Sequence, residues 1–166
     1  ALELTMPDLM VEAALQIIDN NLLVANDSFP IKGKINVLAF GKASILMYHA
    51  AKTICRAANA FGAGLLITHQ NEVNLKPDSI VEEVIFSTHP LISKASVKAG
   101  VKAKQFVESH NAEDILLCLV SGGGSAMVAL PVEELDLKEK IEFISKVMHM
   151  GVPEREENEL KKALSD

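Results

Sequence analysis

Tryptophan is absent from this sequence, and aromatic residues make up only 4% of it. Proteins that bind single-stranded nucleic acid stack bases on aromatic side chains and attract phosphates with clustered basic ones. Basic residues are also in the minority here, 16 against 22 acidic ones, for a net charge of −6. We therefore expect neither a nucleic-acid partner nor binding to an anionic membrane surface.

Cysteine and long apolar runs are scarce as well. The two cysteines, Cys55 and Cys118, lie far apart without a CxxC spacing, which indicates neither a disulfide framework nor a zinc site. No histidine and carboxylate set has metal-ligand spacing, so no metal site is predicted. No apolar run approaches the roughly 18 residues that span a bilayer, and the acidic N-terminal segment is unlike a secretory or transit peptide. We expect a cytoplasmic protein without a membrane partner.

What the 166 residues do contain is an alternation of strand-like and helix-like segments. The predicted strands are Ile35–Phe40, Ala63–Thr68, Ser79–Phe86 and Asp114–Val120. The predicted helices are Pro7–Leu23, Lys42–Ala60, a helix from Ser93 or Ser96 to about Ser109, Leu137–Met150 and a last one from Glu154 onward, with a loop at Asp27–Pro30. Strands that alternate with such helices indicate βαβ units and a mostly parallel sheet. We therefore predict one α/β domain over residues 1–166, a three-layer α/β/α fold with a Rossmann-like sheet.

The stretch Leu117–Pro131, LCLVSGGGSAMVALP, places three consecutive glycines between two serines after an apolar strand. Glycines let backbone N–H groups point together at an anion, and the N-terminus of a following helix adds positive potential. The predicted anion-binding residues are Ser121, Gly122, Gly123, Gly124 and Ser125. A plain strand-to-helix turn is the alternative. The stretch is not a Walker A loop, because no Gly-Lys-Ser/Thr follows it.

Two further polar loops are expected at the same edge of the sheet, since ligands of open α/β sheets bind beyond the carboxyl ends of the strands. Lys42 follows the first strand at a helix N-terminus, where the helix dipole disfavours a cation unless an anion lies between them. An ordinary solvated lysine is the alternative. His89 follows the third strand and could contact a substrate oxygen, act as a base, or be held by the backbone.

Taken in order, these motifs resemble the N-terminal half of the ATP-dependent glycerate 2-kinase family, whose second half is often called the MOFRL domain. The resemblance rests on AFGKA, STHPLISKAS, LVSGGGSAMVALP with LDLKEK after it, and the tail that contains Glu156, Asn158 and Ser165. It implies phosphoryl transfer from ATP, with Mg²⁺, to D-glycerate, giving 2-phosphoglycerate, in a cleft between two domains. It also implies that Lys42 is the catalytic lysine, that Gly122–Ser125 hold a phosphate or the glycerate carboxylate, and that His89, Glu156 and Asn158 line the cleft.

The sequence departs from this family in two ways. Lys161 stands where the family has arginine, which keeps the charge but loses a bidentate fork. The chain also stops where family members continue into a glycine-rich segment and the C-terminal (MOFRL) domain. The resemblance therefore implies that this chain alone is inactive or nearly so, because part of the catalytic constellation is missing.

The expected partners are glycerate, a nucleotide and the C-terminal domain of the same enzyme, and a homodimer is left open. Two other functions are also left open. One is a non-catalytic module that binds an anion or a sugar acid. The other is a hydroxypyruvate reductase, as some relatives are named, which is disfavoured because no GxGxxG fingerprint follows the first strand.

Overall fold

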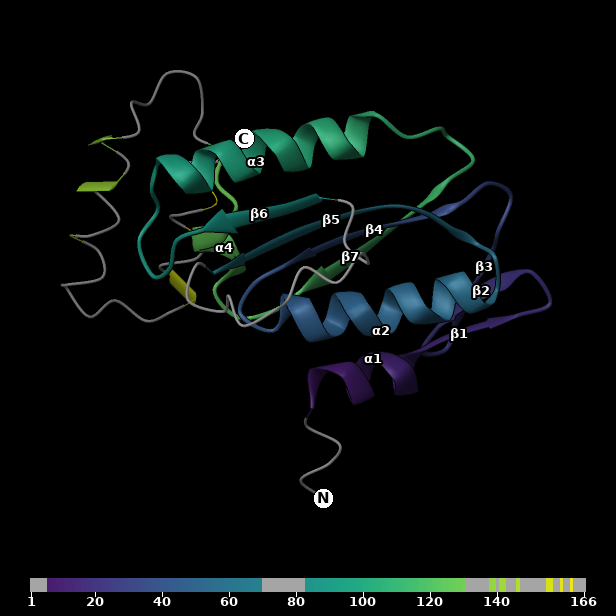
Figure 1. Ribbon diagram of the computed structural model, residues 1–166. Coiled ribbons are helices and arrows are strands. Elements are labelled where there is room, and N and C mark those ends of the chain that lie inside the picture. Colours follow the sequence, from purple (N-terminus) through teal and green to yellow (C-terminus); the bar gives the residue numbers. More distant parts are fainter. Residues whose placement is uncertain are drawn as a thin grey trace.

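A parallel sheet forms the centre of the molecule (Figure 1). The computed structural model describes residues 6–69 and 83–130, together with isolated helical positions between 138 and 162. The elements in chain order are α1 (Pro7–Ala14), β1 (Leu15–Ile18), β2 (Asn21–Val24), β3 (Asp27–Pro30), β4 (Ile35–Phe40), α2 (Ser44–Ala57), β5 (Phe61–His69), β6 (Glu83–Ser87), α3 (Lys94–Glu108), β7 (Ile115–Val120) and α4 (Gly124–Met127). None of the helices in these described stretches is long and apolar enough to cross a membrane.

The four strands of the central sheet lie in the order β6-β5-β4-β7, and every neighbouring pair is parallel. In Figure 1, α2 covers one face of the sheet and α3 covers the other. The predicted three-layer α/β/α fold is therefore confirmed. β4 has the predicted bounds, and its residues are buried or nearly so on both faces, as expected for a strand between two helical layers.

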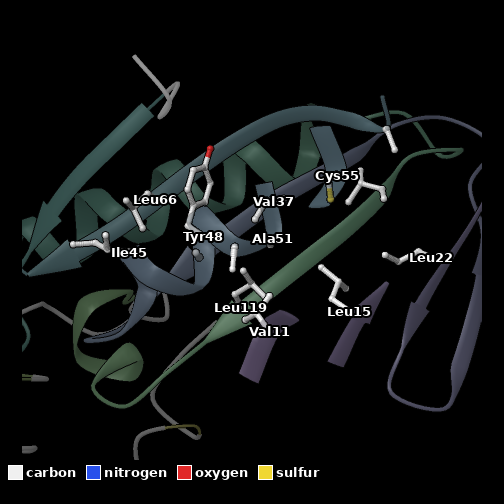
Figure 2. Close-up of a cluster of buried hydrophobic side chains, with 14 of the residues drawn as sticks. Val11, Leu15, Leu22, Val37, Ile45, Tyr48, Ala51, Cys55, Leu66 and Leu119 are labelled. Atoms are coloured by element: carbon white, nitrogen blue, oxygen red, sulfur yellow. The ribbon is translucent and has the colours of Figure 1, made fainter. Parts of the chain in front are cut away.

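Two apolar clusters hold the layers together, one on each face of the sheet. The larger cluster lies under α2 and includes side chains from α1, β1 and β2 (Figure 2). Tyr48 and Ala51 of α2 and Leu66 of β5 are completely buried in it. Burial of each large apolar side chain contributes about 1.5–3 kcal/mol. The buried members of the smaller cluster, under α3, are Leu38, Leu65, Ile67, Ala99, Ala103 and Met127.

The predicted helix over Pro7–Leu23 is wrong in its second half. α1 ends at Ala14, and the chain then forms the antiparallel sheet β1-β2-β3, so the predicted loop at Asp27–Pro30 is a strand instead. The turn between β1 and β2 is made by Asp19 and Asn20, which have positive φ angles of 49° and 60°. Asp and Asn tolerate that conformation better than other non-glycine residues, and such turns favour hairpins.

The other predicted elements agree with the structure except at their ends. α2 begins at Ser44 and ends at Ala57, inside its predicted range. α3 has Ser93 as its N-cap, and the hydroxyl of Ser96 accepts the Ser93 N–H, so both predicted cap residues take part in one capping box. The first residues of the predicted third strand and the predicted helices after residue 136 lie outside the described residues, apart from the isolated helical positions.

Candidate functional site

The carboxyl ends of β4 and β7 meet where the chain leaves the sheet toward opposite faces. Phe40 and Val120, the last residues of these strands, are paired in register. After β4 the chain enters α2 on one face, and after β7 it enters α4, whose Met127 is buried in the cluster under α3 on the other face. Ligands of open α/β sheets bind at such a switch point. The turns at 41–43 and 121–125 therefore border the candidate site.

Hydrogen bonds join these two turns directly. The Ser121 N–H donates to the Phe40 carbonyl oxygen at 3.1 Å, and the Lys42 N–H donates to the Gly122 carbonyl oxygen at 2.9 Å. The Ser121 hydroxyl accepts the Ala43 N–H at 3.0 Å and donates to the Phe40 carbonyl oxygen at 3.5 Å. The two turns are therefore held together by hydrogen bonds.

Gly41 allows these turns to approach so closely. Its φ is 114°, in the left-handed region, and a Cβ at this position would lie 2.5 Å from the carbonyl oxygen of Ser121. Any other side chain would strain the backbone and push the turns apart.

Close packing favours glycine at two of the three consecutive glycine positions. A Cβ on Gly124 would lie 2.9 Å from Cδ2 of Phe40. Gly123 has a φ of 85°, and a Cβ there would lie 2.6 Å from Cδ2 of His89. These two positions therefore have a structural reason to be glycine, whatever the turn binds.

Gly122 has a different environment. The atom nearest to a Cβ placed on it is Cε of Lys42, at 3.8 Å, an ordinary van der Waals distance. Its φ lies outside the left-handed region. Gly122 therefore faces open space beside the Lys42 side chain, where a ligand could approach its backbone.

The glycine turn uses only some of its own N–H groups. The Gly124 N–H donates to the Ser121 carbonyl oxygen at 3.2 Å. Within the stretches that the structure describes, the N–H groups of Gly122, Gly123 and Ser125 have no hydrogen-bond partner. α4 is only four residues long, so the helix potential expected after the turn is small. What the turn offers an anion is its unpaired N–H groups.

Lys42 lies at the other side of these N–H groups. Its side chain is exposed, and among the described residues its ammonium group forms no hydrogen bond or ion pair. Ser44 begins the 14-residue helix α2 two positions later, so Lys42 stands near the positive end of a helix, as predicted. An anion held between Lys42 and the glycine turn would pair with the ammonium group and accept hydrogen bonds from the unpaired N–H groups.

His89 comes to the same place from the far edge of the sheet. The loop after β6 is fixed by hydroxyl groups: the Ser87 hydroxyl donates to the Met127 carbonyl oxygen at 2.6 Å. The Thr88 hydroxyl donates to the Ser93 hydroxyl at 2.6 Å. The His89 ring lies against the glycine turn, since a Cβ on Gly123 would be 2.6 Å from its Cδ2. The structure thus brings together the loops that carry Lys42, His89 and residues 121–125, although their roles stay predictions.

The other two predicted site residues are not placed at this site. Glu156 occupies an exposed helical position, and Asn158 lies outside the described residues. The described residues also contain no group of three or more His, Cys, Asp or Glu side chains that could hold a metal ion.

Sequence reasoning missed how the loops are fixed to one another. The sequence pattern indicates a ligand-binding group at Ser121, but it does not show that the hydroxyls of Ser121, Ser87 and Thr88 hydrogen-bond within the protein. A serine directly after an apolar strand was the available signal, but its partner, the Ala43 N–H, lies 78 positions away in the chain.

Comparison with known proteins places the chain in a family. The model of a family described as a domain of unknown function, DUF4147, matches residues 1–166. The chain belongs to the DUF4147 family. The glycerate kinase of Bos taurus is 28% identical over 153 residues, which covers 87% of this chain and 29% of that protein. The glycerate 2-kinase of Pyrococcus horikoshii is 28% identical over 153 residues, covering 92% of this chain and 33% of that protein.

A crystal structure of a Pyrococcus horikoshii OT3 protein has the same fold as this DUF4147 chain. Its TM-score is 0.82 at 28% identity, covering 96% of this chain and 35% of that one. The resemblance to glycerate kinases is therefore confirmed. The chain spans about a third of the length of the curated relatives it matches.

Proposed function

We propose that this chain is the N-terminal portion of a glycerate kinase that transfers the γ-phosphoryl group of ATP to the 2-hydroxyl of D-glycerate. The names of the relatives support the reaction, and that of the Pyrococcus horikoshii relative supports the 2-position. The observation that carries the proposal is the approach of Lys42 to Gly122, where Cε lies 3.8 Å from the position of a Cβ. A cation and unpaired N–H groups flank one space at the switch point of the sheet.

Phosphoryl transfer needs such groups more than it needs covalent chemistry from the protein. A bond forms between the glycerate hydroxyl oxygen and the γ-phosphorus, the bond between the γ-phosphorus and the β–γ bridging oxygen breaks, ADP leaves with that oxygen, and the hydroxyl proton passes to water. In this proposal the Lys42 ammonium group stabilises the charge on the transferring group. The N–H groups of Gly122, Gly123 and Ser125 orient its oxygens.

The described residues do not supply a site for Mg²⁺ by themselves. They hold no cluster of carboxylates at the glycine turn. Mg²⁺ is commonly held by substrate phosphates with one or two carboxylates, so in this proposal its protein ligands come from residues outside the described ones. Glu156 and Asn158 are proposed to line the same cleft.

A binding module without catalysis is the second candidate. The described part of the chain favours it, because a cation and N–H groups lie at the site without a cluster of carboxylates beside them. The hydroxypyruvate reductase reading receives no support from the two relatives described above, which are named as kinases.

The test compares two lysine variants in the protein encoded by the whole reading frame that contains this sequence. Production of 2-phosphoglycerate from ATP and D-glycerate is followed by ³¹P NMR. Lys42→Met should lower kcat by about 10²–10³-fold, the usual loss for one charge-stabilising donor. Lys32→Met is the matched control. Lys32 is exposed in the loop before β4, at the amino ends of the strands and away from the candidate site. Equal activity of the two variants would refute the role of Lys42.

The binding module is distinguished by a second measurement. If the whole protein binds D-glycerate or ATP in calorimetry but forms no 2-phosphoglycerate, the kinase proposal fails and the module is favoured. Absence of binding to either compound would contradict both.

A further inference from the structure

Ser121 differs from the other residues of the predicted anion site, because its hydroxyl already has two protein partners. It accepts the Ala43 N–H at 3.0 Å and donates its proton to the Phe40 carbonyl oxygen at 3.5 Å. Ser125 at the other end of the turn is exposed and has no such contact within the described residues. The two serines of SGGGS are therefore not equivalent.

The residues that precede and follow Lys42 in the chain both contact Ser121. Gly41, just before Lys42, packs against the Ser121 carbonyl oxygen. Ala43, just after it, donates its N–H to the Ser121 hydroxyl. Lys42 itself donates its N–H to the Gly122 carbonyl oxygen. Lys42 and Ala43 are thus hydrogen-bonded to Gly122 and Ser121, and Gly41 lies too close to Ser121 to carry a side chain.

The hydroxyl is the one side-chain group in this arrangement. Ala43 is the N-cap residue of α2 and cannot cap the helix with its own side chain. Removing the Ser121 hydroxyl would leave the Ala43 N–H without its partner and free the start of α2 to shift. A displacement of about 1 Å at a charge-stabilising group can cost as much as a hundredfold in rate.

We infer that Ser121 is a positioning residue, whose hydroxyl sets the position of Lys42 over the glycine turn rather than contacting the anion. This inference rests on the proposed function, because it gives Lys42 a task at the site. It predicts that the effect of losing the hydroxyl passes through Lys42.

The first test needs no ligand. Amide hydrogen exchange is measured by NMR in the wild type, Ser121→Ala and Ser121→Thr, with Ser109→Ala as control. The Ser109 hydroxyl also donates to a backbone carbonyl, that of Phe106 at 2.8 Å, but at the far end of α3. In Ser121→Ala the amides of Lys42 and Ala43 should exchange at least about tenfold faster, because their hydrogen bonds hold the turn. Ser121→Thr should restore protection, and Ser109→Ala should leave it unchanged.

The second test is a double-mutant cycle on the binding of inorganic phosphate, followed by NMR shifts of the glycine amides. Ser121→Ala should weaken phosphate binding about tenfold when Lys42 is present, and less than about twofold in the Lys42→Met background, since coupled residues are not additive. A structural defect without this coupling would weaken binding equally in both backgrounds.

The outcomes separate this inference from the proposed function. Equal loss in both backgrounds overturns the positioning role, as does unchanged protection of the Lys42 amide in Ser121→Ala. If Ser121→Ala does not fold, the wild type and Ser121→Thr decide the question. An Ala43 amide that exchanges without protection in the wild type overturns the inference. An Ala43 amide that is protected in both proteins supports it. A wild type that binds no phosphate contradicts the anion site of the proposed function, and the exchange experiment still decides whether Ser121 holds the turn.

Discussion

Alanine substitution at neighbouring glycines should have opposite effects on the stability of this domain. At Gly123 the φ of 85° is left-handed, which costs a non-glycine residue roughly 1–2 kcal/mol. The new Cβ would also lie 2.6 Å from Cδ2 and 3.0 Å from Nε2 of His89, so the ring must move. An off-rotamer side chain costs about 0.5–1.5 kcal/mol. The smaller entropy of the unfolded chain returns about 0.4–1 kcal/mol.

The net expectation for Gly123→Ala is a loss of about 2 kcal/mol in the free energy of unfolding, within a range of about 0.5–3 kcal/mol. With a urea m-value of roughly 2 kcal/mol/M for a domain of this size, the midpoint should fall by about 1 M. Urea denaturation followed by circular dichroism measures this shift, and the His89 ring signals in NMR should move in the native state.

Gly122→Ala is the matched control for stability. The nearest atom to its new Cβ is 3.8 Å away, and its φ is not left-handed, so only the entropy term applies. Its midpoint should therefore rise by about 0.2–0.5 M, because a gain of about 0.4–1 kcal/mol is divided by the same m-value. If Gly122→Ala is as destabilising as Gly123→Ala, or if both are neutral, the separate assignments of these glycines are wrong.

Two further predictions concern groups away from the site. The Asp114 carboxylate accepts the N–H groups of Lys34 and, more weakly, Asn111, which together hold its pKa below the ordinary value. A carboxyl with a lowered folded-state pKa adds stability above its unfolded pKa and loses it as pH falls through the folded value. The difference in free energy of unfolding between the wild type and Asp114→Asn, measured by urea denaturation, should therefore be largest above about pH 5 and become smaller in stronger acid. A difference that does not change with pH would refute the stabilising role of the ionised Asp114 carboxylate. Burial raises the pKa of Cys55 to about 11, whereas Cys118 is exposed on the edge strand β7. A thiol reagent at about pH 8 should label Cys118 first and Cys55 only after unfolding, as mass spectrometry can show; equally fast labelling of Cys55 in the native protein would contradict its burial.

The central sheet could be predicted from the sequence because its strands are short, apolar and clearly bounded. Ile35–Phe40 ends at Gly41, and β4 has the same bounds. The segment after α1 could not be assigned by periodicity, since Ile17, Ile18 and Leu22 suit a helical face as well as paired strands. The turn at Asp19 and Asn20 makes this segment a pair of strands rather than a helix. The spacing of the apolar residues does not indicate that turn.

The place of the site was also predictable, but the way it is held together was not. The rule that ligands bind beyond the carboxyl ends of parallel strands brought the loops of Lys42, His89 and the glycines to one edge. Which groups pair across that edge depends on strand order. Only the adjacency of β4 and β7 places the Ser121 hydroxyl opposite the Ala43 N–H.

The triple glycine therefore has more than one cause, and this changes what it says about function. Read as a single motif, it indicates an anion cradle in which all three residues serve the ligand. In the structure, Gly124 accommodates Phe40 and Gly123 accommodates His89, and Gly122 alone lies beside the Lys42 side chain in open space. The case for an anion at this site consequently depends on the unpaired N–H groups and on Lys42, not on the number of glycines. A substitution that moves Lys42 should therefore harm anion binding more than one that fills the space at Gly122.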